Sequence, residues 1–183
     1  MSDQTARHMD TVLKYPDGRP VSYTDGLGLV GSGVWLDGGV QRGSERAGER
    51  RVPAVTLAVA PPKSKDRQRF IVEKAQELGV ERLVWLTTDH AQGRPVATKR
   101  SAAWTVAALE QSRGAWLMAV EESVALGYLN NPILLHADAP ESLATMDLPD
   151  SVTLAIGPEG GFTDRELESA NQMASLPTNI LRT

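Results

Sequence analysis

The sequence predicts an α/β fold with a mostly parallel sheet, preceded by a small β-rich segment. From about residue 54 onward, short apolar runs alternate with stretches of helical periodicity. Continuous apolar runs such as AVTLAVAP are typical of strands that are buried on both faces of a parallel sheet. The apolar run 151–156 leads directly into a glycine-rich loop, and ligands of open α/β sheets bind at such strand ends.

Residues 1–52 differ in character from the rest of the chain. Strand-like runs over 20–40 are interrupted by turn-forming residues, which predicts short β-strands with tight turns at Asp25, Gly26, Gly28, Gly31 and Gly33. The polar stretch QRGSERAGERR has no periodicity and predicts an exposed loop or linker. We therefore divide the chain into a small β-rich domain with its linker, 1–52, and an α/β domain, 53–183.

The α/β domain contains the following predicted elements, in chain order: a strand at 54–61, a helix at 65–79, a strand at 82–87, a helix at 99–112, strands at 132–137 and 151–156, a helix at 164–174, and a last short strand or loop at 179–182. In the first helix, apolar positions recur at helical spacing and Gly79 provides a C-terminal cap. Phe70 and Trp85 are expected to be buried.

The stretch GPEGG, residues 157–161, connects a strand to a helix. Thr163 and Glu166 match a capping box, so the helix is expected to begin at Asp164. Glycines permit positive φ and let the backbone approach a ligand closely. The residues alone leave a second interpretation open, a tight turn whose glycines serve geometry only. The loop matches neither the dinucleotide fingerprint nor the P-loop, so it does not specifically indicate a nucleotide phosphate.

Composition limits the possible functions. The chain has 183 residues and no cysteine, which excludes disulfides and thiolate chemistry. No apolar run approaches the roughly 20 residues of a membrane span, so we expect a soluble cytoplasmic protein without membrane contact. Residues 1–105 contain 16 basic and 12 acidic residues, whereas 106–183 contain 3 and 11. The net charge of −4 therefore conceals a basic front half.

Four segments together resemble one known family. IGPEGGFTDRELESA resembles the signature of the ribosomal RNA small-subunit methyltransferase E family. The stretches LAVAPPKSKDRQRFIVEKAQELGVERLVWLTT, AALEQSRGAW and LPTNILRT resemble other family segments in order and spacing. The resemblance covers 54–183 well. It covers 1–52 weakly, where VSYTDGLG is similar to the family's small, PUA-like N-terminal RNA-binding domain, here shortened.

The resemblance implies a trefoil-knotted α/β fold of the SPOUT class, with helices on both faces of a parallel sheet. It also implies a homodimer that uses S-adenosylmethionine to methylate N3 of a uridine in 16S rRNA. Knots are nearly absent from proteins, so no sequence pattern suggests one by itself. Family members continue beyond the position of Thr183, so the chain is expected to lack their final helix, which completes the knot.

The resemblance also implies which residues hold the cofactor, chiefly through backbone atoms of the knotted loops. They are Leu135, Gly157, Glu159, Gly160, Gly161, Leu176, Ile180 and Leu181. On composition alone the four aliphatic residues of this set are more typical of a core. Glu159 has an alternative role as a charge that favours a helix N-terminus.

The reaction requires loss of the proton on uridine N3 and stabilisation of the developing negative charge. Arg182 is the candidate for an electrostatic role near cofactor or base. None of the three histidines, His8, His90 and His136, falls on a position that the resemblance marks as catalytic. No general base is assigned, and no metal site is expected.

Basic residues, all but Arg113 from the front half, are the candidates for contact with 16S rRNA or the small ribosomal subunit. The set is Lys63, Lys65, Arg67, Lys74, Arg94, Arg100 and Arg113. The alternative interpretation is that these charged side chains are part of an ordinary solvated surface. Arg113 stands one residue before the family's arginine, and Pro177 replaces a family glycine. Two functions therefore stay open, an active rRNA methyltransferase and a non-catalytic or weakly active RNA-binding protein of the same fold. A weaker third is another small-ligand α/β enzyme that shares only the loop.

Overall fold

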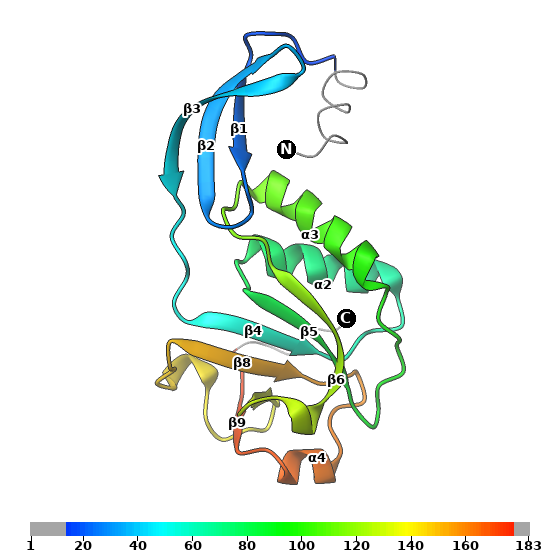
Figure 1. Ribbon diagram of the computed structural model, residues 1–183. Coiled ribbons are helices and arrows are strands. Elements are labelled where there is room, and N and C mark those ends of the chain that lie inside the picture. Colours follow the sequence, from blue (N-terminus) through cyan, green and yellow to red (C-terminus); the bar gives the residue numbers. More distant parts are fainter. Residues whose placement is uncertain (1–13, 178–183) are drawn as a thin grey trace. The chain divides into compact units, whose positions relative to one another are not determined.

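The structure is a computed structural model that describes residues 14–177 in two compact units (Figure 1). Unit 1 contains the described residues up to Arg50 together with Leu109–Leu117. Unit 2 contains Arg51–Ala108 and the described residues from Met118 onward. The strand or loop expected at 179–182 lies outside the described residues.

Unit 1 is built on a three-stranded antiparallel sheet of order β1-β2-β3. The strands are β1 (Pro20–Thr24), β2 (Leu29–Leu36) and β3 (Gly39–Ala47). β2 and β3 are joined at Asp37 and Gly38, both with positive φ, as a tight hairpin requires. The linker expected at 41–51 is therefore wrong over 41–47, which form β3. Most β3 side chains are exposed, so its sequence carries no buried face to indicate a strand.

Unit 2 contains a six-stranded sheet of order β6-β5-β4-β8-β7-β9, and every pairing in it is parallel. The strands are β4 (Ala54–Val59), β5 (Arg82–Thr87), β6 (Ala119–Ala125), β7 (Ile133–Leu135), β8 (Ser151–Ile156) and β9 (Gln172–Ala174). The predicted α/β class with a parallel sheet and a small additional β sheet is confirmed.

Helices cover both faces of this sheet, as predicted. α2 (Lys65–Glu77) and α3 (Thr98–Ser112) pack on one face, and α4 (Asp164–Glu168) packs on the other (Figure 1). Two short 3-10 helices, Leu126–Tyr128 and Leu143–Thr145, lie in connections. Within residues 14–177, no helix is long and apolar enough to cross a membrane.

Several local predictions are wrong. The helix expected over 164–174 ends at Glu168, and residues 172–174 form β9 instead. β6 is absent from the prediction. Phe70 is 60% exposed rather than buried, because α2 turns Gln68, Val72 and Ala75 inward. Trp85 is buried, as expected.

Candidate functional site

Five parallel strands of unit 2 end side by side at one edge of the sheet, here called the carboxyl edge. β8 lies in the middle, with β4 and β5 on one side and β7 and β9 on the other. The glycine loop, residues 157–161, follows β8 directly. The strand order therefore places this loop between two sets of loops, at the position where ligands of open α/β sheets bind.

The glycine loop is fixed at its C-terminal end by α4. Thr163 and Glu166 form the predicted capping box, so the expected start of the helix at Asp164 is confirmed. Gly161 has φ +73°, a conformation that favours glycine, and its N–H donates to the Pro158 carbonyl over 2.9 Å. Glu159 and Gly160 are exposed, and their backbone N–H groups have no hydrogen-bond partner among the described residues. The loop therefore presents free backbone donors.

The turn after β5 is bound to the glycine loop and α4 by side chains that the sequence analysis did not single out for this role. The Asp89 backbone N–H donates to Glu166 Oε1 over 3.0 Å, and the Asp89 carboxylate accepts from Arg165 over 2.9 Å. His90 Nδ1 lies 3.3 Å from the Gly160 carbonyl oxygen and 3.2 Å from that of Gly161. The position of the loop thus depends on β5 as well as on β8.

A buried glutamine holds together the loops that follow β4 and precede α3. Gln68 is 1% exposed. Its Nε2 donates to the carbonyls of Pro62 and Arg94 over 2.7 and 2.9 Å, and its Oε1 accepts from the Val96 N–H over 2.9 Å. Gln68 was not among the site residues predicted from the sequence. Its i, i+4, i+7 spacing with Val72 and Ala75, on the inward face of α2, was the available signal.

The two loops approach so closely that only glycine fits between them. A Cβ on Gly93 would lie 2.0 Å from the Pro61 carbonyl oxygen. Together with Gln68, this contact fixes the segment that carries Lys63 and Ser64.

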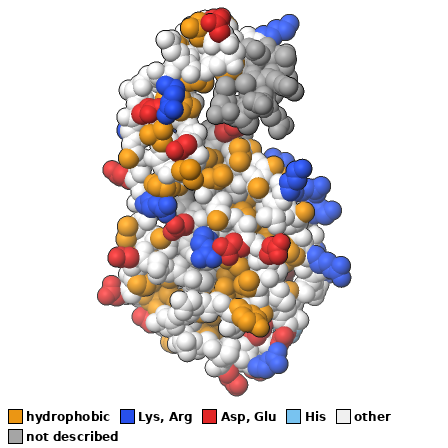
Figure 2. All heavy atoms as spheres, in the orientation of Figure 1, with side chains coloured by type: hydrophobic (Ala, Val, Ile, Leu, Met, Phe, Trp, Pro, Cys, Tyr) orange, Lys and Arg blue, Asp and Glu red, His pale blue; other side chains and the backbone are white. Residues whose placement is uncertain are grey.

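A cavity of about 290 Å³, here called the basic pocket, lies on the β4/β5 side of the glycine loop. It is lined by Lys63, Ser64, Arg67, His90, Gln92, Glu159 and Gly160. The Arg67 guanidinium is 3.7 Å from the Glu159 carboxylate. The pocket therefore brings two predicted RNA-binding residues, Lys63 and Arg67, beside two predicted cofactor residues, Glu159 and Gly160. Figure 2 shows further basic side chains over the N-terminal ends of α2 and α3.

The other predicted RNA-binding residues do not line this pocket. Lys65, Arg94 and Arg100 are exposed on the loop and helix starts nearby. Lys74 lies further along α2, where its ammonium is 2.6 Å from the Glu77 carboxylate. Arg113 has φ +54° and belongs to unit 1.

On the opposite side of the glycine loop, the strand ends are apolar. Leu135 ends β7 and has Ile156 and Ala174 as register partners on the two flanking strands. Leu176 follows β9 and is 48% exposed. Leu135, Gly157 and Leu176 are thus brought to one edge. The remaining candidates Ile180, Leu181 and Arg182 lie outside the described residues.

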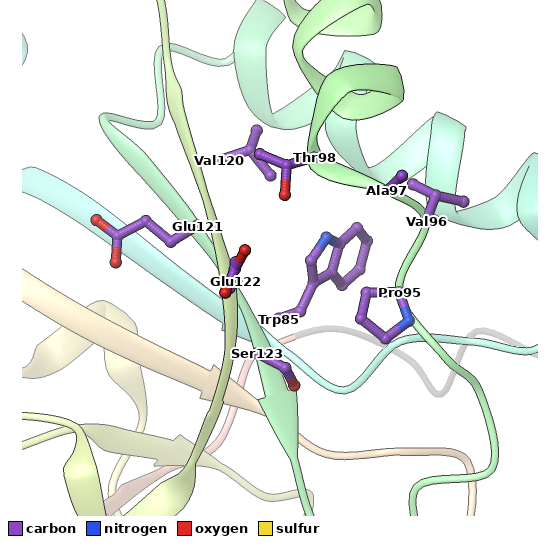
Figure 3. Close-up of a pocket in the computed structure, with 9 residues that line it drawn as sticks. All are labelled: Trp85, Pro95, Val96, Ala97, Thr98, Val120, Glu121, Glu122 and Ser123. Carbon is purple, nitrogen blue, oxygen red and sulfur yellow. The ribbon is translucent and has the colours of Figure 1, made fainter.

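A second cavity of about 310 Å³ lies between β5, β6 and the segment before α3 (Figure 3). Its lining includes the indole of Trp85, whose buried Nε1 has no hydrogen-bond partner among the described residues. None of the predicted site residues lines this cavity. Over residues 14–177, no cluster of three or more metal-ligating side chains occurs.

Two curated proteins named ribosomal RNA small subunit methyltransferase E are similar to this chain. The Rickettsia conorii protein is 33% identical over 147 residues, which cover 70% of this chain and 58% of the relative. The Synechocystis protein is 30% identical over 206 residues, which cover 96% of this chain and 65% of the relative. The chain thus spans less than two thirds of the length of either relative.

A solved structure has the same fold. A ribosomal RNA small subunit methyltransferase E from Neisseria gonorrhoeae, bound to S-adenosylmethionine, superimposes with a TM-score of 0.81 at 22% identity. The match covers 100% of this chain and 84% of that one. The resemblance inferred from the sequence is confirmed. Residues 49–183 match the model of the RNA methyltransferase domain, and the chain belongs to this family.

Proposed function

We propose that the protein is an S-adenosylmethionine-dependent methyltransferase that acts on N3 of a uridine in the 16S rRNA of the small ribosomal subunit. One observation carries the proposal. The glycine loop stands at the middle of the carboxyl edge, with apolar strand ends on one side and the basic pocket on the other. The names of the curated relatives support ribosomal RNA as the substrate.

The apolar side of the glycine loop fits the cofactor. The unpaired N–H groups of Glu159 and Gly160, at the rim of the basic pocket, are available to polar groups of a ligand, and the exposed Leu176 on the apolar side is available to its apolar parts. A Cβ on Gly161 would have no atom within 4 Å, so there is open space beside the loop. The full cofactor set of this proposal is Leu135, Gly157, Glu159, Gly160, Gly161, Leu176, Ile180 and Leu181. When bound, S-adenosylmethionine supplies an activated methyl group, so the protein's task is mainly positioning.

The basic side of the loop fits the RNA. Lys63 and Arg67 can contact phosphates or balance the negative charge that develops on uridine when N3 loses its proton. The other exposed basic residues of the predicted set, Lys65, Lys74, Arg94, Arg100 and Arg113, are proposed as further RNA contacts. The proposal also includes an electrostatic role for Arg182, a knotted C-terminal segment and a homodimer, as the resemblance implies.

The test is methyl transfer by the full chain. Purified protein is incubated with methyl-labelled S-adenosylmethionine and 16S rRNA or small subunits that lack the modification, and digested RNA is searched by mass spectrometry for 3-methyluridine. We expect that product from the wild type and from Tyr128→Phe, a control at a side chain that is 86% exposed and outside the site. Leu176→Asp places a charge on the apolar side, where the apolar parts of the cofactor are proposed to bind, and should strongly reduce it. Cofactor and RNA binding without transfer would indicate an RNA-binding protein instead.

A further inference from the structure

Two histidines at the carboxyl edge have opposite hydrogen-bonding patterns. His90 Nδ1 faces two carbonyl oxygens, those of Gly160 and Gly161, at 3.3 and 3.2 Å. A carbonyl oxygen can only accept, so Nδ1 of His90 carries the hydrogen. In the neutral ring, Nε2 of His90 therefore has the free lone pair.

His136 is held in the other way. Its Nδ1 accepts from the backbone N–H of Asp138 over 3.3 Å, so in the neutral ring the hydrogen is on Nε2. Two histidines on different loops of one sheet edge, after β5 and after β7, are thus held as opposite tautomers. Only the arrangement at His90 leaves Nε2, the ring nitrogen farther from the backbone, with a lone pair that can accept a proton.

The surroundings of His90 are those of a binding pocket. Its exposed side chain lines the basic pocket together with Lys63, Arg67 and Glu159. The ring lies against Gly160, where an added Cβ would be 3.5 Å from the His90 Cβ. Nε2 of His90 has no hydrogen-bond partner among residues 14–177. The pocket's other proton acceptor, the Glu159 carboxylate, faces the Arg67 guanidinium at 3.7 Å.

We propose that His90 is a catalytic residue, the general base that accepts the N3 proton of a uridine bound in the basic pocket. This inference rests on the proposed function and adds the residue that the sequence analysis could not assign. The strand order supports it, because the pocket and the apolar strand ends lie on opposite sides of the glycine loop. Methyl transfer requires N3 and the methyl carbon in direct contact, so the base and the methyl donor must meet at the exposed rim of that loop, at Glu159 and Gly160.

The proposed step is the transfer of the N3 proton from uridine to His90. The N3–H bond of uridine breaks, its proton bonds to the Nε2 lone pair, and the electron pair left on N3 becomes the nucleophile. The imidazolium then releases the proton to water. Lys63 and Arg67 offset the negative charge on the uridine ring, while Nδ1–H holds the glycine loop in place throughout.

The first test determines the tautomer without any methyl transfer. Protein with ¹⁵N-labelled histidine rings is studied by long-range ¹H–¹⁵N NMR at about pH 8, where imidazoles are neutral. His90→Asn and His136→Asn variants assign the signals. We expect an unprotonated Nε2 for His90 and an unprotonated Nδ1 for His136. Added uridine 5′-monophosphate should shift the Nε2 signal of His90 and leave that of His136 in place. A hydrogen on Nε2 of His90 would overturn the inference.

The second test separates proton transfer from loop positioning. The amide nitrogen of His90→Asn can still donate to the glycine carbonyls, but the variant has no group at the Nε2 position. We expect its methyl-transfer rate at neutral pH to fall about 10²- to 10⁴-fold, the usual contribution of a general base. Its affinity for S-adenosylmethionine should change less than about twofold, because the hydrogen bonds that position the glycine loop remain within donor–acceptor reach.

The pH profile provides a readout that a structural role would not change. The wild-type rate should fall on acidification, because imidazolium cannot accept a proton. The rate of His90→Asn should lack this fall on acidification, and it should recover at alkaline pH, where uridine ionises by itself. The charged groups around the ring, Lys63, Arg67, Glu159 and Asp89, stay present in both proteins. A His90→Asn rate within about threefold of wild type overturns the inference alone, whereas a wild type that methylates no RNA overturns the proposed function and the inference together.

Discussion

The two sides of the glycine loop are held in different ways. On the β4/β5 side, side chains make the connections, through Gln68, Asp89 and His90. On the β7/β9 side, backbone groups make most of them, with one further hydrogen bond from the Ser175 hydroxyl to the Glu141 carbonyl. The His136 N–H donates to the Ala174 carbonyl over 3.0 Å, and the Ser175 N–H donates to the Glu141 carbonyl over 2.8 Å.

This difference matches the two ligands that we propose. A side built from polar side chains can discriminate charge and move a proton, as RNA methylation requires. A side built from backbone and aliphatic groups can hold a ligand without a charged side chain, which suits the binding through main-chain atoms that the resemblance implies for the cofactor. The first three of the following experiments each alter one side of the loop, and the fourth tests unit 1; they run from the largest expected effect to the smallest.

Gln68→Leu should have the largest effect, because it removes three hydrogen bonds at a site that is 1% exposed. The carbonyls of Pro62 and Arg94 and the N–H of Val96 lose their partner. We expect the free energy of unfolding to fall by about 3 kcal/mol, measured by urea denaturation. The matched control Gln111→Leu, at an exposed position of α3, should change it by less than about 0.5 kcal/mol. Equal losses in both variants would contradict the role of Gln68.

Replacement of Lys63 and Arg67 by alanine tests the basic pocket. We expect weaker binding of 16S rRNA, with the slope of log affinity against log salt reduced by about one unit per lost phosphate contact. Lys74→Ala should change the slope less, because Lys74 is paired with Glu77 outside the pocket. The measurement is fluorescence anisotropy over a salt series. A larger change for Lys74→Ala would indicate that the RNA-binding surface lies further along α2, outside the basic pocket.

Gly161→Ala tests the opposite side through the backbone. At φ +73° an L-residue is strained by about 1 to 2 kcal/mol, so the loop should leave this conformation for part of the time. We expect about tenfold weaker binding of S-adenosylmethionine in calorimetry, the factor that about 1.4 kcal/mol corresponds to. Gly127→Ala is the control, because a Cβ there meets no atom within 4 Å and its φ is not positive. Unchanged cofactor affinity in Gly161→Ala would argue against cofactor binding at this loop.

The smallest expected effect is in unit 1, where Asp25 contributes to the stability of the protein at low pH. This contribution does not involve the carboxyl edge. Backbone N–H groups of Leu29 and Leu27 hold the pKa of the Asp25 carboxyl below its usual 3.8. A lowered pKa in the folded state contributes stability above the unfolded value, and this is lost as pH falls through the folded value. Asp25→Asn should therefore flatten the loss of thermal stability below about pH 4. A melting-temperature series identical to wild type would contradict this contribution.

The sequence predicted the features that depend on neighbouring residues. Thr163 and Glu166 are three residues apart, so their capping box and the glycine loop before it were visible in one short stretch. The strand at 82–87 was visible because its residues 83–86 are all buried. β3 and β6 were missed because most of their side chains are exposed, and β9 because it has only three residues.

The site depends on contacts that no local pattern records. Asp89 and His90 act on residues 70 or more positions away, at Glu166, Gly160 and Gly161. Phe70 was expected to be buried because apolar residues usually are, yet the inward face of α2 contains Gln68. A buried glutamine is favourable only when distant backbone groups satisfy its amide, and these groups become visible only in the folded chain.

The central claim, that cofactor and RNA base bind on opposite sides of the glycine loop, is tested most directly by NMR titration of ¹⁵N-labelled protein. S-adenosylmethionine should shift the backbone amide signals of 135, 157–161 and 175–176. Uridine 5′-monophosphate should shift those of 63–67 and 90–92, and each ligand should leave the signals of the other outer set in place. Cofactor-induced shifts confined to 63–67 and 90–92, or an unaffected glycine loop, would contradict the account.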